Sequence, residues 1–261
     1  MLARITSLIR KRKVETAADR TAAMSRLTPA QSFCAIGDIH GCYTQLRDVL
    51  HQLDSATDPS ETRVFLGDYI DRGPQSKQVL ALLFQLSQSA PDRVICLKGN
   101  HEQMMLDFID DPAGNGQHWL RHGGVAALTS YGIAVPHKEL DSATAVDVAN
   151  ALEAALPAGM LTWLRQLPLH WASGNLHCVH AALSPRRAPE DQRKAVLLWG
   201  HPDFLTKPRD DGNFVVHGHT IVKQPGVRAS RIALDTGAYR TGRLTAARLS
   251  TGNCRFFEAK A

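Results

Sequence analysis

Five short apolar runs, each followed at once by polar residues of metal-binding types, constrain the fold of this chain more than any other feature. The runs cover residues 33–36, 64–66, 94–97, 176–179 and 214–216. Their β-branched and aromatic residues predict buried strands. Because open α/β sheets bind ligands where strands end, the side chains that follow the five runs are expected to share one site.

The residues after these runs predict a site for two metal ions. They are Asp38, His40, Asp68, Asn100, His180 and His219. The first two are two positions apart, so on an extended backbone their side chains leave the same face and can hold one ion together. Asp68 is expected to bridge that ion to a second one, which the last three residues complete. Mixed oxygen and imidazole ligands favour Mn, Fe or Zn over Ca or Mg, and such a two-ion centre suits cleavage of a phosphate ester.

Each of these residues also has a simpler interpretation. Asp38 and Asn100 are typical of helix N-caps, and a lone histidine such as His180 is more often a core residue than a ligand. Asp71 and Arg72 can form an ion pair that only shapes a loop. One two-ion site explains six positions together, whereas the simpler interpretation needs six coincidences. No chemistry is assigned to six further histidines: His51, His118, His122, His137, His170 and His177.

Six sequence blocks, in one order, resemble the phosphoprotein phosphatase family of metallophosphoesterases, in its bacterial serine/threonine branch. They read GDIHG, GDYIDRGP, LKGNHE, HAALSP, HGHT and DTGA and lie between Gly37 and Ala238. The resemblance implies an α/β fold, a calcineurin-like sandwich of two packed mixed β-sheets flanked by helices, with an inserted helical cap. It also implies hydrolysis of phosphate monoesters, above all protein phosphoserine and phosphothreonine, by a bridging hydroxide that two divalent metal ions activate.

The same resemblance assigns roles to residues beside the metal ligands. His101 matches the family's catalytic histidine, which protonates the leaving alkoxide, and Asp71 matches the aspartate that orients it. Arg72 matches a phosphate-binding arginine, whose planar fork suits two phosphate oxygens. Asn100 is assigned to the substrate as well as to the metal. The six expected metal ligands coincide with those of the family, and manganese is the expected metal.

The chain departs from the family pattern after Trp199. Many relatives carry a second phosphate-binding arginine there, and His201 stands in its place. His201 when protonated, or Arg209 from the following loop, is expected to bind the substrate instead.

Two other functions stay open at this point. A symmetrical dinucleoside tetraphosphate hydrolase is a close relative, although those enzymes usually carry alanine where this chain has Asp71. A scaffold that binds a partner without catalysis is the other alternative. Scaffolds of this origin usually lose metal ligands, and here all six are present.

Charge divides the chain into a short extension and a body. Residues 1–30 carry seven of the 30 basic and two of the 25 acidic residues, so 23 of each remain in residues 31–261. The net charge of +5 therefore belongs to the extension, and the body, expected to be the catalytic domain, shows no charge pattern for nucleic acid. Apolar residues at helical spacing before the basic run at 10–13 predict a helix for a membrane surface or a partner, or else a solvated extension.

Within the body, residues 43–53, 74–88 and 101–108 have helical spacing, and residues 112–168 are interpreted as the helical cap. The family resemblance implies that this cap borders the substrate groove. Strand patterns cover 196–199, 232–234, 244–249 and 255–258. Five cysteines without framework spacing favour a reducing cytoplasm, with peripheral membrane contact through the extension as an addition. No segment has the length of a transmembrane helix.

Overall fold

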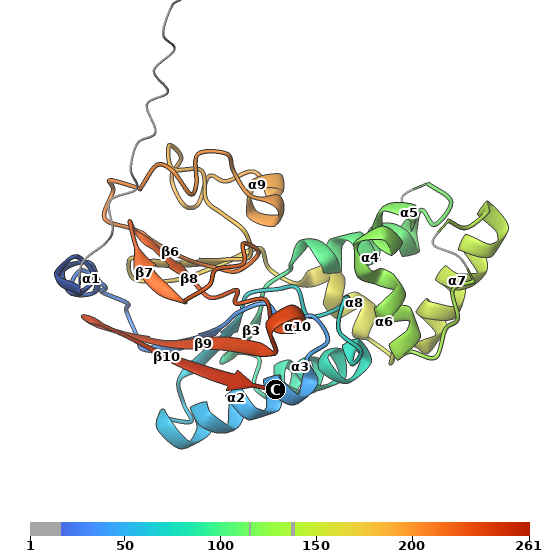
Figure 1. Cartoon of the computed structure of the whole chain (residues 1–261), viewed down its shortest axis with the longest axis horizontal. Helices are drawn as coiled ribbons and strands as arrows, with labels where there is room; N and C mark the ends of the chain where they lie inside the picture. The colour runs from blue at the N-terminus through green and yellow to red at the C-terminus, as the bar shows by residue number, and fades with distance from the viewer. Residues whose placement is uncertain (1–16, 115, 137–138) are drawn as a thin grey trace, which may run out of the picture.

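The protein is described here by a computed structural model, which covers residues 17–114, 116–136 and 139–261. Two five-stranded mixed sheets pack face to face, and helices flank the pair (Figure 1). The α/β sandwich expected from the sequence is therefore confirmed.

The first sheet has the strand order β10-β9-β1-β2-β3. Its strands are β1 (Phe33–Ile36), β2 (Thr62–Phe65), β3 (Val94–Cys96), β9 (Arg243–Ser250) and β10 (Asn253–Lys260). Strands β1, β2 and β3 are parallel, whereas β9 pairs antiparallel with both β1 and β10. Helices α2 (Tyr43–Ala56) and α3 (Ser76–Ser89) connect the parallel strands and lie below this sheet in Figure 1.

The second sheet has the order β4-β5-β6-β8-β7. Its strands are β4 (His170–Ser173), β5 (Leu176–Val179), β6 (Phe214–His217), β7 (Gly226–Arg228) and β8 (Arg231–Ala233). Strands β5, β6 and β8 are parallel, and β4 and β7 add antiparallel edges. Each sheet thus contains three adjacent parallel strands, and the carboxyl ends of these strands carry the motif residues.

The remaining helices lie beside the sheets. They are α1 (Ala17–Met24), α4 (Asn100–Asp110), α5 (Gly116–Trp119), the π-helical turn η1 (Leu120–Gly124), α6 (Val125–Ser130), α7 (Ser142–Ala155), α8 (Met160–Gln166), α9 (Lys194–Trp199) and α10 (Ala238–Thr241). Elements α4 to α8 form a helical lobe at one end of the sandwich (Figure 1). The helical pattern expected for residues 112–168 lies in this lobe.

Strand β1 shows how the sequence builds two cores at once. Successive side chains of a strand point to opposite faces. Phe33 and Ala35 join the cluster between the two sheets, whereas Cys34 and Ile36 join the cluster that packs against the helices. Since both faces are covered, the strand is apolar at all four positions and all four are buried.

Most expected strands and helices occur within a few residues of their predicted bounds, but one is wrong. Residues 196–199, expected as a strand, lie in helix α9. A short apolar run does not distinguish a strand from a buried helical segment, and only Val196 is β-branched here. The edge strands β4 and β7 were not anticipated, because their residues are only partly apolar.

The boundary of the N-terminal extension also differs from the sequence expectation. Leu27 is fully buried in the cluster between the sheets, and Thr28 N donates to Asn175 Oδ1 at 2.8 Å. The packed body therefore begins before residue 31. The amphipathic segment before residue 14 lies outside the described residues. Among the described helices, none has the length and apolar character needed to cross a membrane.

Candidate functional site

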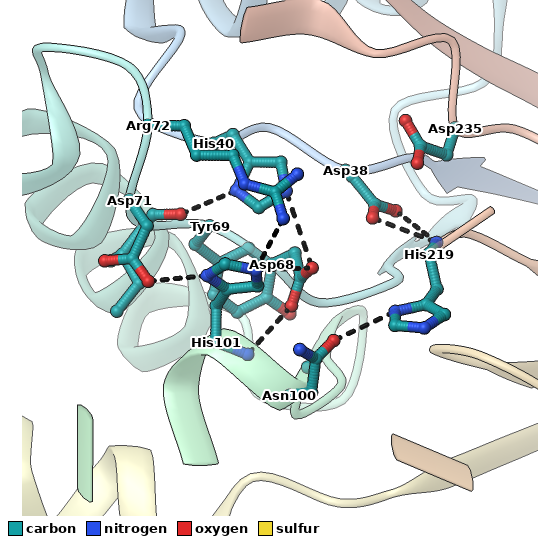
Figure 2. Close-up of polar contacts among 12 residues, drawn as sticks. Asp38, His40, Asp68, Tyr69, Asp71, Arg72, Asn100, His101, His219 and Asp235 are labelled. Atoms are coloured by element: carbon teal, nitrogen blue, oxygen red, sulfur yellow. Dashed lines mark hydrogen bonds and ion pairs between the residues drawn. The ribbon is translucent and has the colours of Figure 1, made fainter. Parts of the chain in front are cut away.

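The carboxyl ends of five parallel strands meet at one edge of the sandwich. In the first sheet, Ile36 pairs with Phe65 and Phe65 with Cys96, so β1, β2 and β3 end in register. In the second sheet, Val179 pairs with His217. The loops that follow are joined directly, because the amides of Ile39 and His40 and the carbonyl of Asp68 lie 3.0 and 2.9 Å apart. The expected ligands from both sheets therefore come together (Figure 2).

Asp68 lies at the centre of this cluster. Its carboxylate is 3.5 Å from His40 Nε2, 3.3 Å from His180 Nε2 and 3.8 Å from His101 Nε2. Two groups of candidate ligands share it, one with His40 and His101 and one with His180 and His219, and within each group the ligand atoms lie within 4.8 Å of one another. Asp68 thus occupies the bridging position that the sequence predicts for it.

The second group also includes Asn100, as expected. Its Oδ1 is 2.8 Å from His180 Nε2 and 2.9 Å from His219 Nδ1, and the two ring nitrogens are 3.2 Å apart. His180 Nδ1 donates to the Leu66 carbonyl at 2.9 Å, which leaves its Nε2 as the atom with the lone pair. Lone pairs from an imidazole and an amide oxygen therefore converge on one point, which is the donor set that a divalent cation requires.

His40 is prepared in the same way. Its Nδ1 donates to the Ile70 carbonyl at 2.8 Å, so Nε2 faces Asp68 with its lone pair. Burial lowers the pKa of His40 to about 3 and that of His219 to about 4. Both rings are thus neutral at working pH and available as ligands.

Asp38 also lies at the site, where it contacts the loop of the second sheet. The first group contains His101, whereas the Asp38 carboxylate accepts from the His219 backbone N–H at 3.1 and 2.9 Å. Figure 2 shows Asp38 next to Asp235, a residue to which the sequence assigned no role. Asp38 therefore braces the loop of the second sheet, and its expected role as a metal ligand with His40 stays a prediction.

Buried carboxylates crowd this edge of the sheets. Burial, and then Asp235 and Asp68, raise the pKa of Asp38 well above its usual value. Burial also raises the pKa of Glu102 to about 7 and that of Asp235 to about 6, and Asp68 adds to both shifts. Divalent cations would reverse this mutual repulsion, so the electrostatics fit the donor geometry.

Next to the ligands, His101 and Asp71 form a buried pair. His101 Nδ1 lies 2.5 Å from Asp71 Oδ2, and the same oxygen accepts from Trp119 Nε1 at 2.9 Å. Burial by itself lowers the pKa of His101, but Asp68 and Asp71 outweigh it and the net shift is upward. Burial raises the pKa of Asp71 too, although the bonds from His101 and Trp119 oppose that shift. The pair can therefore hold a proton on the imidazole.

Arg72 is the exposed cation beside this pair. Its Nη2 is 3.2 Å from His101 Nε2, and its guanidinium carbon lies 4.7 Å from the centre of the Tyr239 ring. Arg72 and His101 thus converge on a point that solvent can reach. An anion bound there would meet both groups.

The backbone at the site is unusual. Among the described residues, seven other than glycine have positive φ angles, and five of them are site residues: His40, Asp68, Asp71, Arg72 and His219. Each such conformation costs about 1 kcal/mol or more and persists only where the surroundings enforce it. Glu102 supplies part of that support, because its carboxylate accepts the backbone N–H groups of Asp68, Tyr69 and Gly99 at 2.8–2.9 Å.

Of the substrate residues proposed from the sequence, Arg209 is not free for that role. Its guanidinium donates to the Asp211 carboxylate and to the carbonyls of Ser184 and Arg187, and the side chain is buried. That interpretation is therefore wrong. His201 lines a separate pocket of about 210 Å³ with Arg187 and others, and its Nδ1 accepts from Asp203 N at 3.1 Å. In the described part of the chain, no hydrogen bond or ion pair joins His201 to the metal ligands.

Four residues at the site were missed by sequence reasoning: Asp235, Glu102, Trp119 and Tyr239. Asp235 and Glu102 belong to two of the sequence blocks that carry the family resemblance, DTGA and LKGNHE. The resemblance therefore included both residues, but it assigned no role to either. Trp119 lies in the segment 112–168 that was expected to form the helical cap. Nothing in its local sequence indicates a bond to a residue 48 positions away.

The family of the chain can now be stated. Residues 32–234 match the model of the calcineurin-like phosphoesterase family, and this span contains every expected metal ligand. The chain belongs to this family. The family uses a binuclear divalent metal centre, and the two groups that share Asp68 are the candidate ligands in this phosphoesterase. The chain is thus a metallophosphoesterase hydrolase.

Curated relatives with two different activities are similar to this phosphoesterase to almost the same extent. A symmetrical bis(5'-nucleosyl)-tetraphosphatase from Janthinobacterium sp. (strain Marseille) is 30% identical over 257 residues, covering 83% of this chain and 92% of the relative. Serine/threonine-protein phosphatase 1 from Salmonella typhimurium (strain LT2) is 29% identical over 220 residues, covering 82% of this chain and 90% of the relative.

Solved structures support the fold. A protein serine/threonine phosphatase from Saccharomyces cerevisiae, with similarity to human phosphatase PP5, superposes with a TM-score of 0.57 at 16% identity. The superposition covers 94% of this chain and 87% of the yeast one. At this identity the likeness concerns the fold alone.

Proposed function

We propose that this phosphoesterase removes phosphate from phosphoserine and phosphothreonine in proteins. The observation that carries the proposal is the buried pair of His101 and Asp71, with 2.5 Å between Nδ1 and Oδ2. A serine or threonine alkoxide is a strongly basic leaving group, so its departure needs a general acid. A phosphate leaving group, as in a polyphosphate, departs without a proton, so its cleavage needs no general acid such as this pair.

The residues around the pair have distinct roles in this proposal. Asp71 accepts from Nδ1, which fixes the ring and leaves Nε2 as the atom that donates the proton to the alkoxide. Arg72 binds two phosphoryl oxygens with its planar guanidinium. Two divalent cations, when bound, supply charge neutralisation and an activated water for in-line attack.

Manganese is the metal we propose for this site. The ligand groups mix carboxylate and amide oxygens with imidazole nitrogens, and they contain no thiolate. This mixture suits Mn, with Fe and Zn as alternatives. The five cysteines are all buried as free thiols, which supports a reducing compartment, the cytoplasm, as the setting. Peripheral contact of the basic extension with a membrane or a partner stays a proposal, which rests on the sequence of residues 1–13.

Symmetrical hydrolysis of dinucleoside tetraphosphates is the second candidate. It is supported by the Janthinobacterium relative, whose length the alignment covers almost completely. The two activities differ in leaving group, and this difference separates them in an assay.

The test is a substrate panel with the Mn-loaded protein. Phosphoserine and phosphothreonine peptides, a phosphotyrosine peptide, p-nitrophenyl phosphate and diadenosine tetraphosphate are compared by kcat/KM. We expect the phosphoserine and phosphothreonine peptides to exceed diadenosine tetraphosphate. Asp71→Asn should lower turnover of those peptides far more than turnover of p-nitrophenyl phosphate, whose leaving group needs no proton. Preferred cleavage of diadenosine tetraphosphate, with little effect of Asp71→Asn, would support the second candidate instead.

A further inference from the structure

A pocket of about 670 Å³ lies at the same edge of the sheets as the metal site, and its charged side chains are basic. Lys223, Arg240, Arg243 and Lys260 line it, together with uncharged residues and Ala261 at the end of the sequence. We call these four side chains the basic pocket. Because residues 31–261 are neutral as a whole, four cations at one opening are a local concentration of charge rather than a general property of the surface.

Most of this charge is available to a ligand. In the described part of the chain, no ion pair joins Lys223, Arg240 or Lys260 to a carboxylate, and all three are exposed. Arg243 is partly engaged, since its Nη1 lies 3.7 Å from Glu258 and its Nη2 donates to the Lys223 carbonyl. These four side chains give the opening an excess of positive charge.

Sheet register places the basic pocket at the same edge as the metal ligands. Ile36, the last residue of β1, pairs with Ala246, so Arg243 lies beyond the carboxyl end of β1, in the direction of Asp38. Lys260 pairs with Arg243 and lies at the same edge. The second sheet reaches the pocket through Ile221, two residues after His219.

Hydrogen bonds tie the pocket wall to the site. Val222 N donates to the Asp235 carbonyl at 2.8 Å, and Thr236 Oγ1 donates to the Arg243 carbonyl at 2.7 Å. Arg240 follows Tyr239, the ring against which Arg72 lies. The ring that Arg72 contacts is therefore the chain neighbour of a residue that lines the basic pocket.

We propose that the basic pocket binds acidic side chains next to the phosphorylated residue, so that acidic phosphopeptides are the preferred substrates. This inference rests on the proposed phosphoprotein activity and adds a substrate class to it. Exposed lysine and arginine side chains carry their charge on flexible stems, which suits carboxylates of varied position. The polyphosphate of a dinucleotide is also negatively charged, but its leaving group departs without the proton that His101 would donate.

The experiment compares three phosphoserine peptides that differ only in their flanks: acidic, neutral and basic. We expect the parent protein to favour the acidic over the neutral peptide by about three- to tenfold in kcat/KM, as a few solvent-exposed ion pairs allow. The preference should shrink as salt is raised, because exposed charges are screened. The doubly reversed variant Lys223→Glu with Arg240→Glu should favour the basic peptide instead.

Two controls make the result specific to the pocket. Arg93→Glu reverses one exposed charge beside β3, at the opposite edge of the first sheet from β10, and should keep the acidic preference. Turnover of p-nitrophenyl phosphate should be unchanged in the double variant, because neither residue belongs to the catalytic machinery.

The outcomes separate this inference from the proposed function. If peptides are cleaved without an acidic preference, or if the double variant keeps it, the basic pocket does not read peptide charge and the inference is wrong. If no peptide is cleaved, the proposed function fails and the inference fails with it. If the double variant loses only diadenosine tetraphosphate cleavage, the pocket serves polyphosphate, which contradicts the inference.

Discussion

Two carboxylates act on His101 from opposite sides of its ring. Asp71 lies 2.5 Å from Nδ1 and Asp68 lies 3.8 Å from Nε2. Together they favour the imidazolium form of His101, although the ring is almost fully buried. Because Asp71 holds Nδ1, the proton available for transfer is the one on Nε2.

The first prediction concerns this proton. His101→Asn should lower kcat on an alkyl phosphate by about 10²–10⁴, the usual contribution of general acid–base catalysis. The loss on an aryl phosphate should be smaller, because an aryl oxide leaves without a proton. His51→Asn, on the exposed face of α2, is the matched control and should have no effect. Equal losses on both substrates would mean that His101 acts in another way.

Trp119 is expected to position Asp71 rather than to touch the substrate. Asp71 Oδ1 is buried without a hydrogen-bond partner among the described residues, so Oδ2, held by Trp119 Nε1 and His101, fixes the whole carboxylate. Trp119→Phe keeps an aromatic ring but removes that donor.

The second prediction follows from this bond. Trp119→Phe should lower kcat on an alkyl phosphate about tenfold, since a hydrogen bond to a charged group contributes about 1.5–3 kcal/mol. KM and aryl phosphate turnover should change less. The control is Trp163→Phe, because the Trp163 ring packs on Phe84 away from the site and its replacement shows any general effect of losing an indole. An equal fall on alkyl and aryl phosphates would indicate that Trp119 only stabilises the fold.

These residues also show how far sequence carries the site. The expected ligands each lie within four residues of a strand end, so a local motif was enough to find them. Trp119 and Tyr239 come to the site through tertiary packing of the cap and of α10, which no local pattern encodes. Arg209 was misassigned for the same reason, because the carbonyls of Ser184 and Arg187 that bind its guanidinium come close only in the fold.

At the scale of elements, the site depends on loops that pass unusually close to one another. Gly218 separates the end of β6 from His219, and a β-carbon there would overlap the Asp38 carboxylate. The loop after β6 can therefore approach the loop after β1 only with glycine at this position. Strand ends were predictable from apolar runs, but this approach depends on how the two sheets pack.

The third prediction tests that approach. Gly218→Ala should push Asp38 and His219 apart, weaken Mn binding and lower turnover, while the protein stays folded. Gly226→Ala in β7 is the matched control, because its β-carbon meets no atom within 4 Å. Mn affinity is measured by titration of the metal-free proteins, with circular dichroism to verify folding. Equal Mn affinity in the two variants would show that the spacing between these loops does not set metal binding.

At the scale of the whole molecule, the metal site joins the two sheets. Asp38, Asp68 and Asn100 follow strands of the first sheet, and His180 and His219 follow strands of the second. The layered architecture was predictable from the alternation of strands and helices and from the family resemblance. The burial of Leu27 was not predictable, because a single apolar residue after a short helical segment does not indicate whether it packs in a core.

The last prediction uses this arrangement. Ions that bind only the folded state stabilise it by RT ln(1 + [L]/Kd), about 2.7 kcal/mol at a hundredfold excess over Kd. The ions also relieve the repulsion among the buried carboxylates. Removing the ions should therefore destabilise both sheets. Exhaustive chelation should therefore abolish turnover and lower Tm by several degrees, and Mn should restore both. His180→Ala with His219→Ala should lack the Mn-dependent rise in Tm. Full turnover after chelation, with elemental analysis showing no metal, would contradict the two-ion site itself.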